Sequence, residues 1–274
     1  MATQIFSSLA DTREAQTPDA PSANVVRMRR DRTLSARLPV VPEGYVWYPR
    51  CKAVADFIVA VLLAIPALPV VILAALAVKL TSRGPMFYTQ KRVGKEGNLF
   101  SILKLRTMYY QCESLSGPRW CVPGDSRITL VGYVLRKTHL DELPQLINVL
   151  RGEMSLIGPR PERPEFVPDL ERALPTYRQR LNVRPGVTGL AQVQLPPDTD
   201  IESVRRKLAH DLFYVRRLGP WMDLRLLICT AFYAVGMPFG IVGRLLGLPA
   251  SAEIERSTRD LVPDAPVNRQ RLAA

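Results

Sequence analysis

Residues 57–78 form an uninterrupted apolar run, FIVAVLLAIPALPVVILAALAV, which constrains the fold more than any other stretch. Its 22 residues include no charged or polar side chain. A straight helix of that length measures about 33 Å, enough to cross the roughly 30 Å core of a bilayer. The alternative is a core helix of a soluble protein, but the run has no polar face to present to water. We therefore expect a membrane-inserted helix within residues 45–80.

The flanks of this run bear on whether it crosses the membrane. Pro66 and Pro69 lie at its middle, where each removes a helical N–H and favours a kink. Basic residues stand on both sides: Arg27, Arg29, Arg30, Arg32, Arg37, Arg50 and Lys52 before it, and Lys79, Arg83, Lys91, Arg92, Lys95, Lys104 and Arg106 after it. Because basic flanks tend to stay cytoplasmic, we expect a re-entrant helix–break–helix. A kinked spanning helix with one basic side outside is the alternative.

The composition agrees with a protein that works at a membrane surface. The chain has 37 Lys and Arg against 25 Asp and Glu, a formal net charge of +12. Anionic lipid head groups, nucleic acid or a polyphosphate substrate would each suit this charge. Few aromatic residues interleave with the basic stretches, so we expect no nucleic-acid partner. The four cysteines and two histidines lack the spacing of a metal site.

We predict an α+β chain with one catalytic domain and appendages. Residues 1–44 are polar without an apolar period, which predicts a disordered polar and basic tail. Residues 81–225 should form a mostly helical catalytic domain with a small β-hairpin, from the runs around Val93-Gly94-Lys95-Glu96-Gly97-Asn98, and interfacial amphipathic helices. Residues 226–250 should form an apolar helix, interfacial or packed in the core, before a mobile tail at 251–274.

Two adjacent carboxylates, Asp141 and Glu142, open an amphipathic helical pattern. If Asp141 is the N-cap, Pro144 falls at the third helical position, where its missing N–H does no harm. Both carboxylates would then lie at the positive end of the helix dipole, where a phosphate could also bind. The same pattern would arise if Asp141 only capped the helix and Glu142 were a first-turn charge without a catalytic role.

A proline-rich turn follows, Gly158-Pro159-Arg160-Pro161, and the segment 184–189 (RPGVTG) resembles it. Prolines on both sides restrict the backbone at Arg160 to extended or turn conformations. A guanidinium held in this way suits bidentate phosphate binding, although a rigid loop with a solvated arginine would look the same. The chain contains neither a Walker A loop nor a dinucleotide-binding fingerprint.

These motifs occur in a known order. They are Lys52-x-x-x-Asp56, Lys79-Leu80-x-Ser82-x-Gly84-Pro85, Gln90-x-Arg92-Val93-Gly94, Lys104-x-Arg106-Thr107-Met108, Arg127-Ile128-Thr129-x-Val131-Gly132, Leu140-Asp141-Glu142-Leu143-Pro144-Gln145, Met154-Ser155-x-x-Gly158-Pro159-Arg160-Pro161-Glu162 and Val183-Arg184-Pro185-Gly186-x-Thr188-Gly189-Leu190. In this order they resemble the bacterial sugar transferases, monotopic polyprenyl-phosphate sugar-1-phosphate transferases that start glycan assembly. The chain is similar to a short, exopolysaccharide-initiating form with an added polar tail.

The resemblance implies a catalytic role and Mg²⁺ binding for the Asp141-Glu142 pair, with Asp141 as the nucleophile. It implies transfer of a sugar-1-phosphate from a UDP-sugar donor to undecaprenyl phosphate, through a phosphosugar–enzyme intermediate. We expect the following residues to bind substrate: Arg160, Arg136, Arg184, Lys104, Arg106, Pro159 and Pro161. The family's re-entrant helix breaks at a Ser-Pro pair that aligns with Leu68-Pro69, so the break here would depend on Pro69 and Pro66.

The implied location is the cytoplasmic face of the bacterial inner membrane, in contact with membrane lipids, and the sequence leaves a homodimer open. Two other functions compete with this interpretation. One is a non-catalytic basic membrane adaptor that recruits an acidic partner. The other is a hydrolase of lipid-linked phosphates, which would differ by needing no polyprenyl phosphate acceptor.

Overall fold

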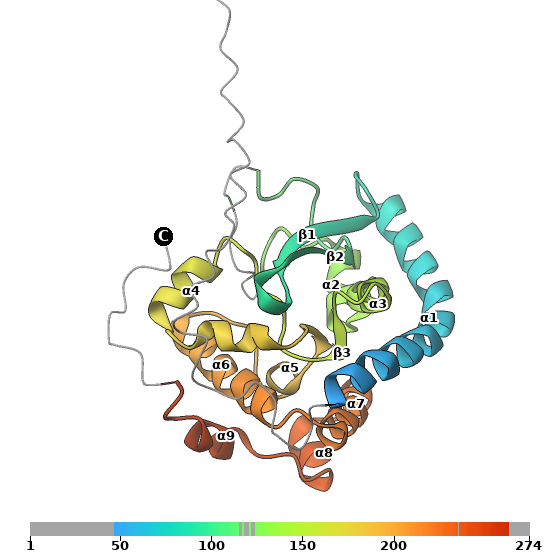
Figure 1. The fold of residues 1–274 in the computed structure, drawn as a ribbon. Coiled ribbons are helices and arrows are strands. Elements are labelled where there is room, and N and C mark those ends of the chain that lie inside the picture. The colour runs from blue at the N-terminus through green and yellow to red at the C-terminus, as the bar shows by residue number, and fades with distance from the viewer. Residues whose placement is uncertain (1–46, 115–116, 118–120, 122–123, 235, 263–274) are drawn as a thin grey trace, which may run out of the picture. The chain divides into compact units, whose positions relative to one another are not determined.

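The structure is a computed structural model that describes residues 47–114, 117, 121, 124–234 and 236–262. The tail predicted to be disordered at 1–44 therefore lies outside the described residues. The described part is mostly helical, with two small two-stranded sheets (Figure 1). Its elements are α1 (Tyr48–Thr81), β1 (Phe87–Val93), η3 (Lys95–Gly97), β2 (Leu99–Leu105), α2 (Leu130–Lys137), η4 (Leu140–Gln145), α3 (Leu146–Leu150), β3 (Ser155–Ile157), α4 (Val167–Ala173), η5 (Tyr177–Asn182), β4 (Gly186–Thr188), α5 (Leu190–Gln194), α6 (Ile201–Arg216), α7 (Pro220–Ala234), α8 (Phe239–Leu245) and α9 (Ser251–Ser257).

Helix α1 contains the whole apolar run and has two different faces. Small side chains line the face that packs on the protein, among them Ala60, Ala64, Ala67, Ala74 and Ala75. Large apolar side chains are exposed on the other face, among them Phe57, Ile58, Leu62, Ile65, Leu68 and Leu73. Of the described helices, α1 is the one long and apolar enough to cross a membrane.

The prolines of α1 do not end the helix. Pro66 and Pro69 lie inside one continuous helical assignment, and Figure 1 shows that α1 bends along its length. The break predicted from these prolines is therefore a bend, because each proline removes one N–H without removing the rest of the helical ladder.

A buried polar cluster ties the N-terminal end of α1 to the rest of the protein. The Lys52 ammonium lies 2.6 Å from a carboxylate oxygen of Asp223 in α7. The hydroxyl of Tyr48 donates to the same Asp223 oxygen at 2.6 Å, and the hydroxyl of Tyr214 in α6 donates to the other at 2.7 Å. All these side chains are largely buried, so the ion pair is shielded from solvent and fixes the first turns of α1 on α6 and α7.

Arg106 holds the other end of α1. Its guanidinium donates to the carbonyls of Pro85 (2.7 Å), Arg83 (2.5 Å) and Ser82 (2.9 Å), just after the helix ends. Arg106 is only 4% exposed. Arg106 was expected to bind substrate, and in the structure its guanidinium donates to three backbone carbonyls of the segment that follows α1.

The sequence predicted one of the two sheets. The expected hairpin is confirmed, since β1 and β2 pair antiparallel from Phe87 opposite Leu105 to Val93 opposite Leu99. The second sheet, β3 with β4, is parallel and was not predicted. It depends on glycine, because a Cβ atom on Gly186 would lie 2.1 Å from the nitrogen of Gly158 and one on Gly189 would lie 2.2 Å from its oxygen.

The C-terminal part departs from the prediction in two ways. The single apolar helix expected over 226–250 is two helices, α7 and α8, with Leu226 and Cys229 buried but Trp221 and Leu245 exposed. The predicted mobile tail begins with helix α9, which packs against α6. Ile254 is fully buried, and Val262 nearly so. Ile254 in α9, with Leu261 and Val262 after it, are the buried apolar side chains of this segment, which was expected to be mobile.

His210 joins α6 to this C-terminal segment and gives a testable pH dependence. The ring is fully buried, with Nδ1 2.8 Å from the carbonyl oxygen of Arg206 and Nε2 3.2 Å from the Ser251 hydroxyl and 3.3 Å from the side-chain oxygen of Gln194. Burial lowers the pKa of His210, although its bond to Arg206 and the charge of Glu255 oppose this. The neutral ring is therefore favoured in the folded state.

We expect this histidine to make the protein less stable in mild acid. A folded-state pKa below the unfolded value of about 6.5 gives stability that is full above pH 6.5 and is lost as the pH falls. The measurement is the melting temperature between pH 7.5 and pH 5.5, for the wild type and for His210→Gln, which does not titrate. The wild type should lose more of its melting temperature over this range. Equal losses in both proteins would show that another group is responsible.

Candidate active site

The carboxylate pair lies in a short 3-10 helix, η4, that leads directly into α3. The N-cap is His139, in the left-handed conformation with φ of 56°, and Asp141 and Glu142 follow in the first turn. The predicted register, with Asp141 as N-cap, is therefore wrong by two residues. Leu140 explains the shift, because it packs on the apolar cluster formed by α1, α2 and β2 and so belongs inside the helix.

Glu142 is bound by two cations from distant parts of the chain. The Lys104 ammonium, from β2, lies 2.7 Å from one of its oxygens. Arg160 contacts both oxygens, at 2.5 Å through Nη2 and at 3.2 Å through Nη1. Burial alone would raise the pKa of Glu142, but Arg160 and Lys104 outweigh it and hold this pKa well below its usual range. Glu142 is therefore ionised at neutral pH, and its oxygens are already paired.

Asp141 differs from its neighbour. It is 6% exposed, and no group in the described part of the chain donates a hydrogen bond to its carboxylate. Burial raises the pKa of Asp141, and the negative charge of Glu142 adds to this, while Lys104, Arg136 and Arg160 oppose it. Asp141 is thus a carboxylate with unoccupied lone pairs beside three cationic side chains. It can accept a phosphorus atom or a metal ion without losing an existing contact.

Arg136 comes to the site from α2. Its Nε donates to the Thr107 hydroxyl at 2.8 Å, and its Nη1 lies 3.0 Å from the sulfur of Cys121. Thr107 was part of a recognised motif but was given no role by the sequence. Its position directly after Arg106 means that one stretch of chain holds both the end of α1 and a site arginine.

The other predicted substrate-binding residues divide into two groups. Pro159 and Pro161 are buried on either side of Arg160, which is exposed, so the turn presents the arginine outward. The guanidinium of Arg184 lies beside Gly152, 3.9 Å from the place a Cβ atom on that glycine would occupy. The charges of Lys104, Arg136 and Arg160 all act on Asp141, whereas substrate binding by Arg106 and Arg184 stays a prediction.

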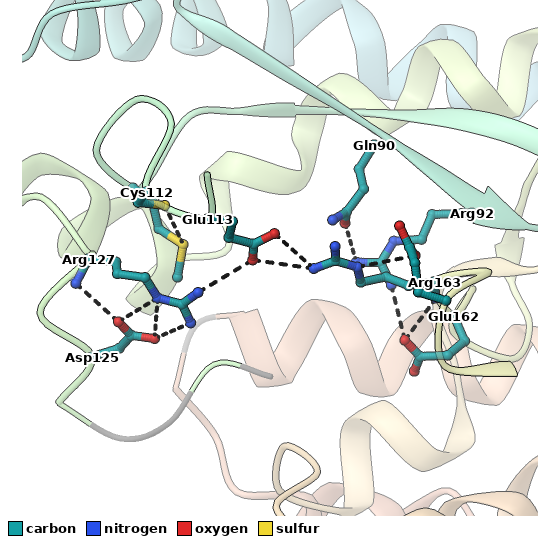
Figure 2. Close-up of polar contacts among 10 residues, drawn as sticks. Gln90, Arg92, Cys112, Glu113, Asp125, Arg127, Glu162 and Arg163 are labelled. Atoms are coloured by element: carbon teal, nitrogen blue, oxygen red, sulfur yellow. Dashed lines mark hydrogen bonds and ion pairs between the residues drawn. The ribbon is translucent and has the colours of Figure 1, made fainter. Parts of the chain in front are cut away.

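A chain of alternating charges supports the site from one side (Figure 2). Asp125 pairs with Arg127, whose guanidinium also lies 3.4 Å from Glu113, and Glu113 pairs with Arg163 at 3.1 Å. Nearby, Arg92 donates to Gln90 and lies 3.5 Å from Glu162. Three separate segments, at 90–92, 113–127 and 162–163, are linked in this way. The network fixes the chain around the proline-rich turn.

The residues present fit a magnesium ion that takes only one or two of its ligands from the protein. In the described part of the chain, no three potential metal-ligating side chains lie together. Mg²⁺ commonly takes one or two protein carboxylates and fills its remaining positions with phosphate oxygens and water. The unpaired oxygens of Asp141 suit that mode of binding, and Glu142 would have to release a cation to join it.

A family comparison decides where this chain belongs. The sequence model described as "Bacterial sugar transferase" matches residues 47–236, which include every element from α1 to α7. The chain belongs to the bacterial sugar transferase family. Helices α8 and α9 of this sugar transferase follow the matched region.

Named relatives of this sugar transferase include an Aeromonas hydrophila protein called UDP-N-acetylgalactosamine-undecaprenyl-phosphate N-acetylgalactosaminephosphotransferase. It is 42% identical over 174 residues, which are 63% of this chain and 41% of the relative. A Caulobacter vibrioides protein called UDP-glucose:undecaprenyl-phosphate glucose-1-phosphate transferase is 44% identical over 183 residues, 65% of this chain and 67% of the relative. A Rhizobium leguminosarum exopolysaccharide production protein is 40% identical over 167 residues, 59% of this chain and 84% of the relative.

Proposed function

We propose that this sugar transferase moves a sugar-1-phosphate from a UDP-hexose to undecaprenyl phosphate and releases UMP, as the first membrane step of exopolysaccharide or other glycan assembly. The observation that carries the proposal is the unpaired Asp141 carboxylate beside three cationic side chains, in a helix, η4, that packs against α1. A charged donor and a lipid acceptor would meet at such a place. The names of the relatives support both substrates.

The first step forms a covalent intermediate on Asp141. A carboxylate oxygen attacks the β-phosphorus of the donor, forming an Asp–O–P bond, while the bond from that phosphorus to the bridging oxygen breaks. UMP leaves with the bond's electron pair. Lys104, Arg136 and Arg160 offset the charge that makes an anion reluctant to approach a diphosphate. Asp141, with Glu142 beside it, would hold Mg²⁺, and the ion would add positive charge there.

The second step transfers the sugar phosphate to the lipid. A phosphate oxygen of undecaprenyl phosphate attacks the same phosphorus, and the Asp–O–P bond breaks. The product is a diphosphate-linked sugar lipid, and Asp141 returns as a carboxylate. No net proton or electron is consumed, so Glu142 needs only to hold its two cations in place.

We further propose that α1 enters and leaves the bilayer on one face, the cytoplasmic face of the bacterial inner membrane. Both ends of α1 are fixed to the same body, through Asp223 at one end and Arg106 at the other. A spanning helix would separate these ends by the thickness of the membrane. Exposed apolar side chains on neighbouring helices, including Leu130 (90% exposed) and Leu245 (81% exposed), suit the same lipid surface.

Cysteine labelling tests this topology. We expect Cys51 and a cysteine at Arg83, each as the sole cysteine of the chain, to be shielded from an impermeant thiol reagent added to intact cells. Both should react once the cells are opened, because Cys51 lies in the first turn of α1 and Arg83 just after its last residue, and the proposal puts both ends of the helix on the cytoplasmic face. Replacement of Pro66 and Pro69 by leucine should favour the spanning form. If one site of the unaltered helix reacts in intact cells, α1 crosses the membrane.

The reaction itself is tested with protein purified in detergent. A panel of UDP-sugars is offered with undecaprenyl phosphate and Mg²⁺, and UMP release and lipid product are measured. We expect sustained UMP release only when both donor and acceptor are present. A basic adaptor would release no UMP with any donor. A hydrolase of lipid-linked phosphates would release phosphate from the lipid substrate without any donor.

Arg160→Lys tests whether the site needs the planar guanidinium of Arg160 or only its positive charge. The Arg160 guanidinium contacts both oxygens of Glu142, and a lysine cannot reproduce this planar fork. A hydrogen bond between charged groups contributes about 1.5–3 kcal/mol, so we expect kcat/KM to fall about ten- to a hundredfold. Arg172→Lys, at an arginine whose side chain is 79% exposed, is the matched control. Equal, small effects would make Arg160 an ordinary surface charge.

A further inference from the structure

Donors from other segments hold the backbone of the proline-rich turn around Arg160. Pro159 and Pro161 have no N–H to donate, so the carbonyls of the turn need donors from elsewhere. Four such bonds are present: from Gly186 N to Pro159 O (2.9 Å), from Arg180 Nη2 to Arg160 O (2.7 Å), from Arg92 Nη1 to Pro161 O (3.0 Å), and from Val93 N to Glu162 O (2.9 Å). Each carbonyl from 159 to 162 is thus fixed from outside.

Two of these donors are side chains, and Arg180 is more buried than Arg92. It lies in η5, is 8% exposed, and places its Nε 2.9 Å and its Nη2 2.7 Å from one carboxylate oxygen of Asp211 in α6. Its Nη1 donates to the hydroxyl of Tyr177 at 2.7 Å, and its guanidinium lies 5.1 Å from the centre of the Tyr177 ring. The contacts with Asp211 and Tyr177 leave Nη2 aimed at the carbonyl of Arg160.

A buried ion pair of this kind is poor as a source of stability, because both charges lose their hydration. The contacts of the pair suggest that it orients the turn. Asp211 holds the Arg180 guanidinium, Arg180 holds the Arg160 carbonyl, and the Arg160 side chain on the outer face of the turn contacts Glu142. Neither side chain of the Arg180–Asp211 pair contacts the side chain of Lys104, Arg136 or Arg160.

We propose that Arg180, oriented by Asp211, is a positioning residue that sets the place of the Arg160 guanidinium through the Arg160 carbonyl. The proposal rests on the proposed function, in which Arg160 meets a phosphate of the donor. A reacting group displaced by about 1 Å can lose on the order of a hundredfold in rate. Loss of Arg180 should therefore reduce catalysis although Arg180 lies behind the turn.

A double-mutant cycle tests this coupling. Arg180→Met is made in the wild type and in Arg160→Ala, and kcat/KM is measured for all four proteins. We expect Arg180→Met to reduce kcat/KM by roughly ten- to a hundredfold in the wild type, and by less than about twofold in Arg160→Ala, where no guanidinium is left to place. A general loss of structure would lower the activity by the same factor in both backgrounds and would overturn the proposal.

Two further variants keep the test independent of folding. Arg180→Met leaves the Asp211 carboxylate buried without its cation, which is strongly destabilising, so Arg180→Met/Asp211→Asn removes both charges together. It should show the same loss of kcat/KM as Arg180→Met. Arg172→Met removes an exposed arginine from α4 and is the control for the loss of a guanidinium. If the double variant is as active as Arg172→Met, the pair has no positioning role.

Hydrogen exchange measures how firmly the turn is held and does not depend on enzymatic activity. We expect the peptide that contains residues 158–163 to take up deuterium faster in Arg180→Met/Asp211→Asn than in the wild type, with peptides from α1 unchanged. Unchanged exchange in this peptide would overturn the proposal. If the wild type released no UMP from any donor but the turn still became mobile, the proposed function would fail while the positioning of Arg160 by Arg180 stood.

Discussion

Asp141→Asn should abolish UMP release while leaving the protein folded. The amide oxygen of asparagine carries no charge and is a poor nucleophile, so we expect the rate to fall by on the order of 10⁴-fold or more. Folding should survive, because no described group donates a hydrogen bond to the Asp141 carboxylate. Since burial raises the pKa of Asp141, its charged form opposes folding at neutral pH. The neutral asparagine should therefore melt at the same temperature or higher.

The covalent step is measured with a donor labelled in the β-phosphate. Without a lipid acceptor, the wild type should retain label on a peptide that contains Asp141, and Asp141→Asn should retain none. Asp169→Asn, at a partly exposed carboxylate in α4, is the control and should label normally. If no residue of the wild type carries label while product still forms rapidly on addition of lipid, transfer is direct. Asp141 would then be a metal ligand or a base.

The structure argues against a purely capping role for Asp141. The sequence left open that Asp141 was only an N-cap, which would account for its position without any chemistry. His139 is the N-cap instead, and Asp141 satisfies no backbone N–H. A buried carboxylate without a capping role has a large desolvation penalty and needs another reason to be there.

Local patterns predicted the elements whose stability is mostly local. The hairpin follows from two extended runs around glycines, and the helical segment formed by η4 and α3 follows from the amphipathic pattern that Asp141 and Glu142 open. The pairing of β3 with β4 could not be read in this way. Each strand has three residues, and they meet across 30 intervening positions from Ser155 to Gly186, so no short-range period indicates them.

The roles of individual arginines depend on contacts that sequence spacing does not encode. Arg106, Arg160 and Arg184 all stand in motifs beside proline, glycine or lysine and looked equally able to bind phosphate. Arg160 reaches Glu142, Arg106 reaches three carbonyls at the end of α1, and Arg184 lies beside Gly152. Only the neighbours in space separate a site residue from a structural one.

The sequence of α1 also indicates which face of the helix packs on the protein. Hydropathy along the run is uniform, so it predicts insertion without a preferred face. Side-chain size is not uniform: Ala60, Ala64 and Ala67 recur at helical spacing and face the protein, while Ile58, Leu62 and Ile65 face outward. Small residues permit close approach between helices and large ones suit lipid contact. The helix thus carries its packing face in residue volume and not in polarity.

Gly186→Ala should strongly destabilise the protein. The added Cβ would lie 2.1 Å from the nitrogen of Gly158, 2.3 Å from the oxygen of Thr188 and 2.6 Å from the oxygen of Gly158. All three are backbone atoms, so no flexible side chain can move aside. Overpacking costs about 1–3 kcal/mol where side chains can adjust, and we expect the upper end of that range or more here.

Gly186→Ala should also disturb the active site. Gly158 opens the turn that presents Arg160, and the nitrogen of Gly186 donates to the carbonyl of Pro159. A displaced β4 would therefore move the turn as it moves the sheet. We expect the melting temperature to fall by about 6–12 °C, from about 2–4 °C per kcal/mol for a domain of this size, and the protein that stays folded to have reduced kcat/KM.

Gly240→Ala is the matched control for this substitution. Gly240 lies in α8, and a Cβ atom there would meet no atom within 4 Å. Alanine is favoured over glycine in a helix by about 1 kcal/mol, so Gly240→Ala should melt at or slightly above the wild-type temperature with unchanged UMP release. If Gly186→Ala behaved like Gly240→Ala in both measurements, β3 and β4 could not approach as closely as the structure shows. The turn that carries Arg160 would then have to be held by Arg180, Arg92 and Val93 without the sheet.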